Sequence, residues 1–385
     1  MNLDHLDWPF YDDAHRALGH QLVEWARAQS VAEGDDVDVT CRAWVRSLAD
    51  AGYLRHCVPA AYGGVREALD SRTLCVAREA LAYHAALADF AFAMQGLGAG
   101  PITLAGSDAA RAHWLPRVAR GDAIAAFALS EPSAGSDALA LTTKAVRDGY
   151  GWRLDGCKTW ISNGGIADFY CVFARTGADA GAAAISAFVV PANVKGLVIA
   201  ERIPLMAPHP LARIELDGCR VGRESLLGEV GEGFKLAMRT LDIFRASVAA
   251  AANGFARRAL DEATRHARQR AMFASTLGEQ PVAQAMIGDM SARIDASALL
   301  IARAAWKRDV KGARTTREAA AAKLTATESA QQVIDAALQL HGASGLRAGS
   351  IVEKLYREIR ALRIYEGATE IQRLVIGRDV LKGVH

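Results

Sequence analysis

The sequence predicts an α+β protein with a helical N-terminal domain, a β-rich central domain and a helical C-terminal domain. Apolar residues recur at three- and four-residue spacing in the first and last parts of the chain, whereas the middle contains short continuous apolar runs. The 385 residues are 51% hydrophobic and 23% charged, which suits a soluble protein with a large core and two or three domains. We place the domains at residues 1–121, 122–231 and 232–385.

The N-terminal domain is expected to be helical over residues 11–121. Helical spacing of apolar residues is visible near its start and again over residues 73–94, whereas the proline and glycines of residues 59–64 predict a loop. The most apolar stretch, residues 85–104, is interrupted by polar residues, glycines and a proline. It therefore predicts a buried helix and not a membrane span.

The central domain is expected to consist of short strands between Asp122 and Leu227. A hairpin turn is predicted at residues 148–151, Asp-Gly-Tyr-Gly, because glycines supply the positive φ that tight turns need. The strands of this hairpin are Thr143–Arg147 and Trp152–Leu154, and the further apolar runs are Ala123–Phe127, Tyr170–Phe173, Ile185–Val190 and Leu197–Ile199.

The C-terminal domain is expected to be a bundle of long helices. Apolar residues spaced three and four apart, such as Phe234, Met238 and Leu241, form stripes, and the small side chains of Ala249–Ala252 let helices approach closely. The predicted helices cover roughly Glu232–Arg270, Pro281–Lys311, Thr315–His341 and Ala368–Lys382.

Compartment and charge give weaker indications. The first residues include acids and lack a basic leader with an apolar core, so we expect a cytoplasmic protein. The six cysteines lie far apart with no Cys-x-x-Cys pair, which predicts buried thiols and neither a disulfide framework nor a metal site. Net charge is +2, but residues after Gly231 carry 24 basic and 16 acidic side chains. Nucleic acid and phosphorylated cofactors both fit this asymmetry, and charge alone does not choose between them.

Three separated motifs resemble the signatures of the acyl-CoA dehydrogenase family. They are Ser-Glu-Pro-Ser-Ala-Gly-Ser-Asp at residues 130–137, Trp-Ile-Ser-Asn-Gly-Gly at 160–165, and Tyr-Glu-Gly-Ala-Thr-Glu-Ile-Gln at 365–372. Each alone would be an ordinary polar turn, but their order is specific. The resemblance covers nearly the whole chain. It implies an N-terminal helical domain, a central β-barrel-like domain and a C-terminal four-helix bundle, with FAD bound between the last two.

Glu366 is the catalytic residue that the resemblance implies. Taken alone, a glutamate just before a predicted helix could instead stabilise the helix N-terminus. In the family, the glutamate of Tyr-Glu-Gly removes the α-proton of an acyl-CoA thioester while the β-hydride passes to flavin. The flanking Tyr365 and Gly367 are expected to contact substrate. Some family members place the base immediately before an arginine on a bundle helix, but here that position is Phe244.

Substrate handling is further implied for Ser136, Asp242 and Arg245. Asp242 and Arg245 lie three residues apart on one helix face, where the alternative is a surface ion pair. By resemblance, Arg245 binds the CoA portion near the active site and Asp242 helps to hold the thioester. Because both residues are present, we expect the substrate to be a CoA thioester.

FAD is the cofactor that the resemblance implies. Trp160 and Ser162 form the strongest pair, because an indole can pack against the flavin ring while a hydroxyl donates to it; the alternative is a core tryptophan. Arg270 and Phe273 resemble the residues that reach the pyrophosphate and adenine across a subunit boundary. The other residues expected to contact FAD are Phe127, Leu129, Ser130, Gln339, Gly342, Thr369 and Glu370.

The chain departs from the family pattern on the adenine side of the expected FAD site. Ala274 replaces the usual glycine after Phe273, and Ala343 replaces a frequent second glycine. Pro281 stands where glutamine is common, and Ala368 stands where threonine is frequent. Each substitution alters one expected contact and leaves the flavin-ring residues in place.

The resemblance implies an FAD-dependent dehydrogenase that forms a trans-2,3-enoyl-CoA. The expected partners are an acyl-CoA substrate, an electron-transfer flavoprotein as acceptor, and further copies of the chain in a homotetramer or a dimer. An acyl-CoA oxidase or a flavin monooxygenase on the same fold is the alternative, although monooxygenases usually lack the combination of Glu366 and Arg245. A DNA-binding relative is the remaining alternative, but such relatives generally carry an additional basic region.

Overall fold

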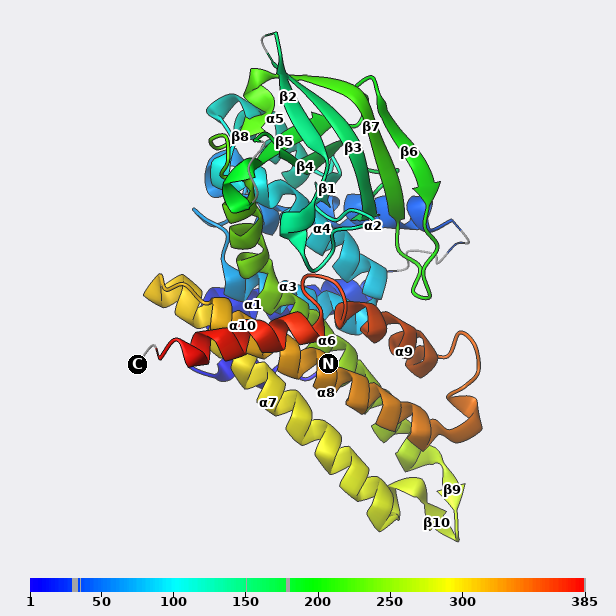
Figure 1. Cartoon of the computed structure of the whole chain (residues 1–385). Coiled ribbons are helices and arrows are strands. Elements are labelled where there is room, and N and C mark those ends of the chain that lie inside the picture. The colour runs from blue at the N-terminus through cyan, green and yellow to red at the C-terminus, as the bar shows by residue number, and fades with distance from the viewer. Residues whose placement is uncertain (30–33, 35, 150, 178–180, 384–385) are drawn as a thin grey trace. The chain divides into compact units, whose positions relative to one another are not determined.

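The computed structural model describes residues 1–29, 34, 36–149, 151–177 and 181–383, which form two compact units (Figure 1). Unit 1 contains residues 1–29, 70–89 and 244–385, and unit 2 contains residues 30–69 and 90–243. The N-terminal helices are thus shared between the two units. The division at residues 121 and 231 stays a prediction.

Helices occupy both ends of the chain and strands occupy its middle, as the sequence predicted. The helices are α1 (Asp13–Ala28), α2 (Val37–Asp50), α3 (Ser71–His84), α4 (Ala86–Ala105), α5 (Asp108–Ala119), α6 (Gly233–Gln269), α7 (Pro281–Lys311), α8 (Thr316–His341), α9 (Ile351–Leu362) and α10 (Thr369–Leu381). The strands are β1 (Ala125–Ala128), β2 (Lys144–Asp148), β3 (Gly151–Ser162), β4 (Phe169–Arg175), β5 (Ile185–Pro191), β6 (Leu197–Arg202), β7 (Leu211–Gly222), β8 (Leu226–Leu227), β9 (Ala271–Met272) and β10 (Ser275–Thr276).

Capping residues set several helix boundaries. Asp70 precedes α3 and accepts a hydrogen bond from the Thr73 N–H at 2.7 Å, which satisfies a donor that the first turn leaves open. Helix α7 begins at Pro281, whose fixed φ suits the first helical position, and is followed by Gly312 at a φ of 60°. The predicted helical stretch 73–94 is divided, because Ala85 adopts an extended conformation between α3 and α4.

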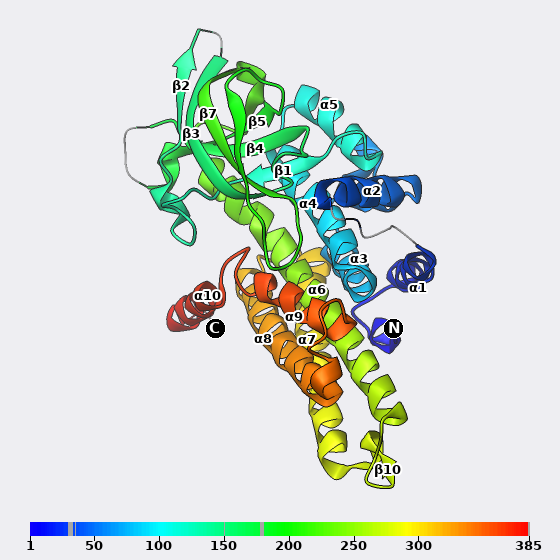
Figure 2. The same cartoon turned by 90° about the vertical axis from the view of Figure 1, so that its right-hand side faces the viewer.

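Unit 2 is built on one eight-stranded sheet. Its order is β6-β7-β3-β2-β4-β5-β8, with β1 paired in parallel to β4 (Figures 1 and 2). The predicted hairpin is confirmed in the antiparallel pairing of β2 with β3, while Tyr150 in its turn lies outside the described residues. Strand β7 was not predicted. Ile214 and Leu216 are buried there on either side of exposed Glu215, an alternation that contains no continuous apolar run.

The core of unit 2 joins the sheet to helices α4 and α5. Trp114 of α5 packs on Phe169 of β4 with ring centroids 4.5 Å apart. Helix α4 lies close to β1, since a Cβ on Gly98 would come within 2.7 Å of the Ala125 Cβ. Buried Gln95 of α4 donates to the Ala123 carbonyl and accepts from the Ala125 N–H. These contacts confirm that the apolar segment is a buried helix, and they fix the position of β1.

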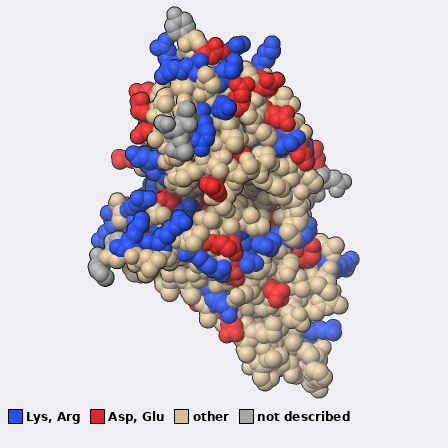
Figure 3. Space-filling model, in the orientation of Figure 1, with Lys and Arg blue, Asp and Glu red and all other residues tan. Residues whose placement is uncertain are grey.

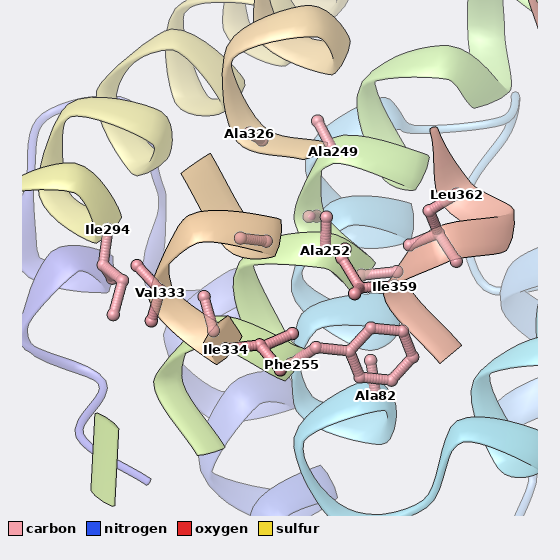
Figure 4. Packing of buried hydrophobic residues seen from close by; sticks show 14 of the residues in the cluster. Ala82, Ala249, Ala252, Phe255, Ile294, Ala326, Val333, Ile334, Ile359 and Leu362 are labelled. Carbon is pink, nitrogen blue, oxygen red and sulfur yellow. The ribbon is translucent and has the colours of Figure 1, made fainter. Parts of the chain in front are cut away.

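The core of unit 1 is the predicted helical bundle. Figure 4 shows Ala249 and Ala252 of α6 among Val333 and Ile334 of α8 and Ile359 of α9, all of which are buried. The small alanine side chains allow close helix packing at this seam. Helix α7 contributes further apolar residues, and its terminal region binds α3: the Asp309 carboxylate of α7 accepts the Ser71 and Arg72 N–H groups at 3.0 and 2.8 Å.

The surface carries mixed charges. Figure 3 shows Lys and Arg side chains gathered over the region where α10 lies in Figure 1, with acidic side chains among them. Within the described parts of the chain, no helix combines the length and apolar character that a bilayer crossing requires. All six cysteines are described and free, and each except Cys157 is buried.

A buried carboxylate in α3 connects several parts of unit 1. Glu79 is 4% exposed and lies 3.0 Å from His5 Nε2, 3.0 Å from Asn253 Nδ2 and 2.7 Å from Arg257 Nε. Burial alone would raise the pKa of Glu79, but His5 and Arg257 outweigh it and hold this pKa at about 2. The ionised carboxylate therefore stabilises the fold.

The variant Glu79→Gln is expected to lower the free energy of unfolding at pH 7 by about 3 kcal/mol, because the half-buried Arg257 loses its countercharge inside the fold. The folded-state pKa of Glu79 lies below its unfolded value of about 4.3. Its stabilisation is therefore present above about pH 4 and lost as pH falls towards 2. Denaturant unfolding at pH 7 and pH 3 measures both effects. Asp50→Asn, in an exposed ion pair with Arg46, is the control and should cost about 0.5 kcal/mol or less; equal losses would contradict the account.

Candidate active site

Glu366 lies in the turn between α9 and α10 with a left-handed backbone. Its φ is 53° and that of Gly367 is 92°. A left-handed conformation costs a non-glycine residue about 1 kcal/mol or more, so the surrounding structure must hold it. The helix-capping alternative for Glu366 does not fit, because α10 starts at Thr369 and its N-cap residue is Ala368.

Two buried donors hold this turn through one carbonyl oxygen. Lys323 Nζ of α8 and Gln372 Nε2 of α10 each lie 2.7 Å from the Gly367 oxygen. Gln372 Nε2 also donates to the Glu366 carbonyl at 3.3 Å. Both donor side chains belong to residues that are 0% exposed. A Cβ at Gly367 would lie 2.5 Å from Gln372 Nε2, so this close packing favours glycine.

The Glu366 carboxylate is desolvated and surrounded by charges. Burial raises its pKa above the ordinary value; Arg78, Lys323 and Arg245 oppose this rise, and Asp89 reinforces it. The Oε2 atom is buried and accepts no hydrogen bond from a described residue. Desolvation makes a carboxylate a stronger base than it is in water. The site can therefore remove a proton from a weak carbon acid.

The backbone N–H of Glu366 is also available. It donates no hydrogen bond to any described residue, whereas the neighbouring Tyr365 N–H donates to the Ala361 carbonyl at 3.1 Å. A backbone N–H in a fixed turn can stabilise charge that develops on a nearby oxygen during a reaction. A candidate base and a candidate oxyanion donor thus come from the same residue.

Arg78 is a buried cation whose charge is matched within unit 1. Its Nε and Nη2 donate to the two carboxylate oxygens of Asp89 at 2.8 and 2.9 Å, and its Nη1 donates to Ser247 Oγ at 3.1 Å. The residue is 1% exposed. Sequence reasoning missed Arg78, Asp89 and Lys323 as neighbours of Glu366. The only signal was a charged residue within an apolar or alanine-rich helical segment.

Helix α6 presents the expected substrate residues. Arg245 is 6% exposed and is therefore not a surface side chain. Phe244 is fully buried, and its carbonyl accepts a hydrogen bond from Ser247 Oγ at 2.6 Å. Asp242 is half-buried on the same helix. Ser136, by contrast, is exposed in the loop after β1.

In unit 2, Trp160 is exposed on a distorted part of β3. Its side chain is 58% exposed and its φ is 58°, at a register shift between Lys158 and Ile161 in the pairing of β3 with β7. Trp152 on the same strand is 4% exposed. Trp160 is therefore not a core tryptophan. β-Bulges often lie next to active sites and re-aim a side chain, as this one does with Trp160.

The end of β3 is fastened to β1. Asn163 has a φ of 60°, is buried, and donates through Nδ2 to the Ala125 carbonyl at 2.9 Å. Its N–H donates to the Pro210 carbonyl, and His209 beside that proline packs on Phe90 with ring centroids 4.5 Å apart. These contacts hold the Trp160–Ser162 segment against β1, which carries Phe127.

A buried ion pair anchors the first motif. Glu131 Oε1 lies 2.8 Å from Lys158 Nζ, and both residues are at most 3% exposed. Lys158 Nζ also donates to the Leu129 carbonyl at 3.1 Å, and the Thr159 N–H donates to the Ser130 carbonyl. Burial would raise the pKa of Glu131, but Lys158 and further hydrogen bonds hold it at about 2. Neither charged residue had been singled out from the sequence.

The hairpin of β9 and β10 carries the expected adenine-side residues. Phe273 is 83% exposed with a φ of 49°, and Ala274 has a φ of 61°. Glycine adopts this left-handed conformation more readily than any other residue. The alanine that replaces the family's usual glycine adopts it as well, at some cost in backbone strain. Arg270 is exposed and accepts at its carbonyl from the Leu277 N–H.

The remaining expected FAD contacts lie in unit 1. Gln339 is exposed near the end of α8, and its carbonyl accepts the N–H of Gly342. Glu370 is exposed at the start of α10. Thr369 is buried, and its hydroxyl donates to Glu328 Oε1 at 2.6 Å, so this side chain is already engaged within the protein.

The chain matches three domain models that together span most of its length. These are the N-terminal, middle and C-terminal domains of acyl-CoA dehydrogenase, matched at residues 12–122, 126–219 and 231–381. The chain belongs to the acyl-CoA dehydrogenase family. It is an FAD-dependent oxidoreductase, as members of this family are.

Relatives of known name agree with this assignment. The chain is 33% identical to a 3-(aryl)acrylate reductase of Clostridium sporogenes, over 97% of this chain and 100% of the relative. It is 34% identical to a cyclohexane-1-carbonyl-CoA dehydrogenase of Geobacter metallireducens, over 95% of each chain.

Solved structures share the fold. Butyryl-CoA dehydrogenase from Megasphaera elsdenii superposes with a TM-score of 0.89 at 28% identity, covering 99% of each chain. A structure described as an electron transferring flavoprotein of Acidaminococcus fermentans gives 0.89 at 31% identity, over 96% of this chain and 98% of that one. An acyl-CoA dehydrogenase complexed with FAD from Bacillus anthracis gives 0.90 at 26%, over 100% and 70%.

The residues at the end of β3 fit a flavin ring. An isoalloxazine needs a flat apolar surface and polar groups at its rim, and the exposed indole of Trp160 with the half-buried Ser162 supplies both. Within the described residues, no group of three or more His, Cys, Asp or Glu is arranged to hold a metal ion.

The variant Lys158→Met is expected to lower the free energy of unfolding by about 3 kcal/mol, because Glu131 is left buried without its cation. Denaturant unfolding followed by circular dichroism measures the change. Arg153→Met is the matched control, since Arg153 forms an exposed ion pair with Asp155 on the same strand and should cost about 1 kcal/mol or less. Similar losses of unfolding free energy in the two variants would contradict a stabilising role of the Glu131–Lys158 ion pair.

Proposed function

We propose that the protein converts an acyl-CoA thioester to a trans-2,3-enoyl-CoA, with Glu366 removing the α-proton. The observation that carries this proposal is the Glu366 carboxylate in a left-handed turn, whose Oε2 is buried and has no described hydrogen-bond partner. Such a group suits proton abstraction from carbon, because water does not compete for its lone pair. Bound FAD supplies the acceptor for the β-hydride.

The α-proton of a thioester is weakly acidic, so the negative charge that moves onto the thioester oxygen must be stabilised. The Glu366 N–H is suited to this task, since it donates no hydrogen bond to a described residue. Tyr365 and Gly367 fix the backbone on either side of it. Because one residue supplies both the base and the donor, the position of this turn determines both contributions.

The CoA thioester is proposed to be held by Arg245, with Asp242 and Ser136 as further contacts. Burial of the Arg245 guanidinium strengthens its attraction for a polar substrate group. Phe244 occupies the position that carries the base in some family members, and its apolar ring leaves Glu366 as the catalytic carboxylate of this chain.

The proposed FAD contacts fall into two groups. Phe127, Leu129, Ser130, Trp160 and Ser162 would face the flavin ring. The residues proposed to reach its phosphate and adenine parts, some from a neighbouring subunit, are Arg270, Phe273, Gln339, Gly342, Thr369 and Glu370. A homotetramer is proposed on this basis, with a dimer as the simpler assembly, and an electron-transfer flavoprotein is the proposed acceptor.

Relatives with different names suggest the substrates to examine first. A suitable panel contains butyryl-CoA, cyclohexane-1-carbonyl-CoA and 3-phenylpropanoyl-CoA, which follow the names of a structural neighbour and two relatives. Rapid turnover with oxygen alone, and no gain from an added dye acceptor, would identify an oxidase instead of a dehydrogenase.

The variant Glu366→Gln is expected to bind FAD and acyl-CoA but to reduce its flavin at least about 10⁴-fold more slowly, because the α-proton has no acceptor. Anaerobic mixing with each thioester of the panel, followed by flavin absorbance, measures the rate. Glu353→Gln on α9 is the control, since that carboxylate pairs with Arg357, and it should leave the rate unchanged. Normal reduction in Glu366→Gln would show that another base operates.

The variant Arg245→Met is expected to raise the KM for the thioester about 10- to 100-fold, since a buried charged contact to substrate is lost. Steady-state kinetics with a dye acceptor measures KM and kcat separately. Arg265→Met removes an exposed arginine from the same helix and serves as the control. An unchanged KM in Arg245→Met would rule out the proposed substrate contact.

A further inference from the structure

Lys323 is a buried cation that the proposed reaction does not yet use. It lies on α8 beside Ala319, Ala320 and Ala322, and the whole residue is 0% exposed. Burial lowers the pKa of its ammonium to about 8, an effect that Glu366 opposes. Burying a charge without compensation is costly, so its partners must account for its position.

The side chain of Lys323 is directed at the turn that carries Glu366. Its Nζ donates to the Gly367 carbonyl at 2.7 Å, and Glu366 is the acidic residue that most strongly raises its pKa against the effect of burial. Arg78, in contrast, is matched by Asp89 in a two-point ion pair. The charge of Lys323 is therefore left to act on Glu366.

Two independent donors converge on the same carbonyl. Lys323 approaches from α8 and Gln372 from α10, so the Gly367 oxygen is held from two helices. The left-handed backbone of Glu366 would relax to a commoner conformation without such restraint. Moving that backbone would displace the carboxylate and its N–H together.

We infer that Lys323 is a positioning residue for the reaction: it fixes the Gly367 carbonyl, and thereby the direction of the Glu366 carboxylate and N–H, and it places a positive charge near that carboxylate. This inference rests on the proposed role of Glu366 as the base. Lys323 acts through Glu366 and contacts neither the substrate nor the cofactor in this role.

The charged groups that face this pair come from several helices. Glu366 is flanked by Arg78 of α3, Asp89 of α4, Arg245 of α6 and Lys323 of α8. Lys323 is in turn influenced by Arg245, Glu328 and Glu370. Removal of Lys323 takes one cation from Glu366 and leaves the other groups in place, so the pKa of Glu366 must rise.

Lys323→Met tests the inference, because methionine keeps much of the volume and removes the ammonium. We expect the rate of flavin reduction at saturating thioester to fall about 10²-fold while half-saturation changes less than about threefold. A base acts in its deprotonated form. A raised pKa of Glu366 therefore moves the acidic limb of the pH–rate profile to higher pH, by about one unit. The substrate is whichever panel thioester reduces the wild-type flavin fastest.

Gln372→Met tests the effect of the position of the Glu366 turn separately from the effect of the charge of Lys323. It removes the uncharged donor to the same carbonyl, so the rate should fall while the acidic limb stays in place. Lys307→Met is the matched control, since Lys307 of α7 pairs with Glu318 near the start of α8, and both the rate and the acidic limb of the pH–rate profile should stay unchanged. A shift of the limb in Gln372→Met would contradict the assignment of the shift to the charge of Lys323.

Hydrogen exchange gives a readout that needs no substrate. Deuterium uptake of peptides covering residues 363–372 should accelerate in Lys323→Met and Gln372→Met and not in Lys307→Met. If no thioester reduces the flavin of the wild-type protein, the proposed function is overturned. Faster deuterium uptake in Lys323→Met would in that case still support the anchoring role of Lys323. The inference would be overturned if Lys323→Met lowers thermal stability but leaves both the acidic limb of the pH–rate profile and the deuterium uptake of residues 363–372 unchanged. If Lys323→Met does not fold, unchanged uptake in Gln372→Met would overturn the anchoring of the turn.

Discussion

The central constraint in this structure is a carboxylate that must be both buried and ionisable. Burial makes Glu366 a stronger base but favours its protonated form. The nearby cations Arg78, Lys323 and Arg245 limit that effect, and Asp89 matches the charge of Arg78. The helices of unit 1 bring these groups together from distant parts of the sequence.

In unit 2, the constraint is to expose a large aromatic side chain from an interior strand of a packed sheet. The bulge in β3 turns Trp160 outward, and buried polar contacts restrain the strand on both sides of it. Asn163 binds the β1 carbonyl of Ala125, and Lys158 binds Glu131 in the following loop. In both units, the residues proposed to meet substrate or cofactor have unusual backbones that buried hydrogen bonds hold in place.

The sequence predicted the long helices and most strands because their apolar periodicity is strong. Strand β7 was missed because its buried residues alternate with exposed ones and form no continuous run. The motifs pointed to Glu366 and Trp160, and the family assignment is confirmed, while the roles of individual site residues stay predictions. Lys323 and Arg78 could not be predicted as neighbours of Glu366, since no local pattern tells which buried charges from separate helices will meet.

The most direct test of this account is the rate of anaerobic flavin reduction by a thioester deuterated at its α-carbon. If Glu366 removes the α-proton during the reaction, the wild-type protein should reduce its flavin more slowly with the α-deuterated thioester than with the protiated one, and the slowing should be present at saturating substrate. Rapid flavin reduction that is insensitive to α-deuteration, under conditions where β-deuteration slows it, would contradict proton abstraction by Glu366 as part of the hydride-transfer step.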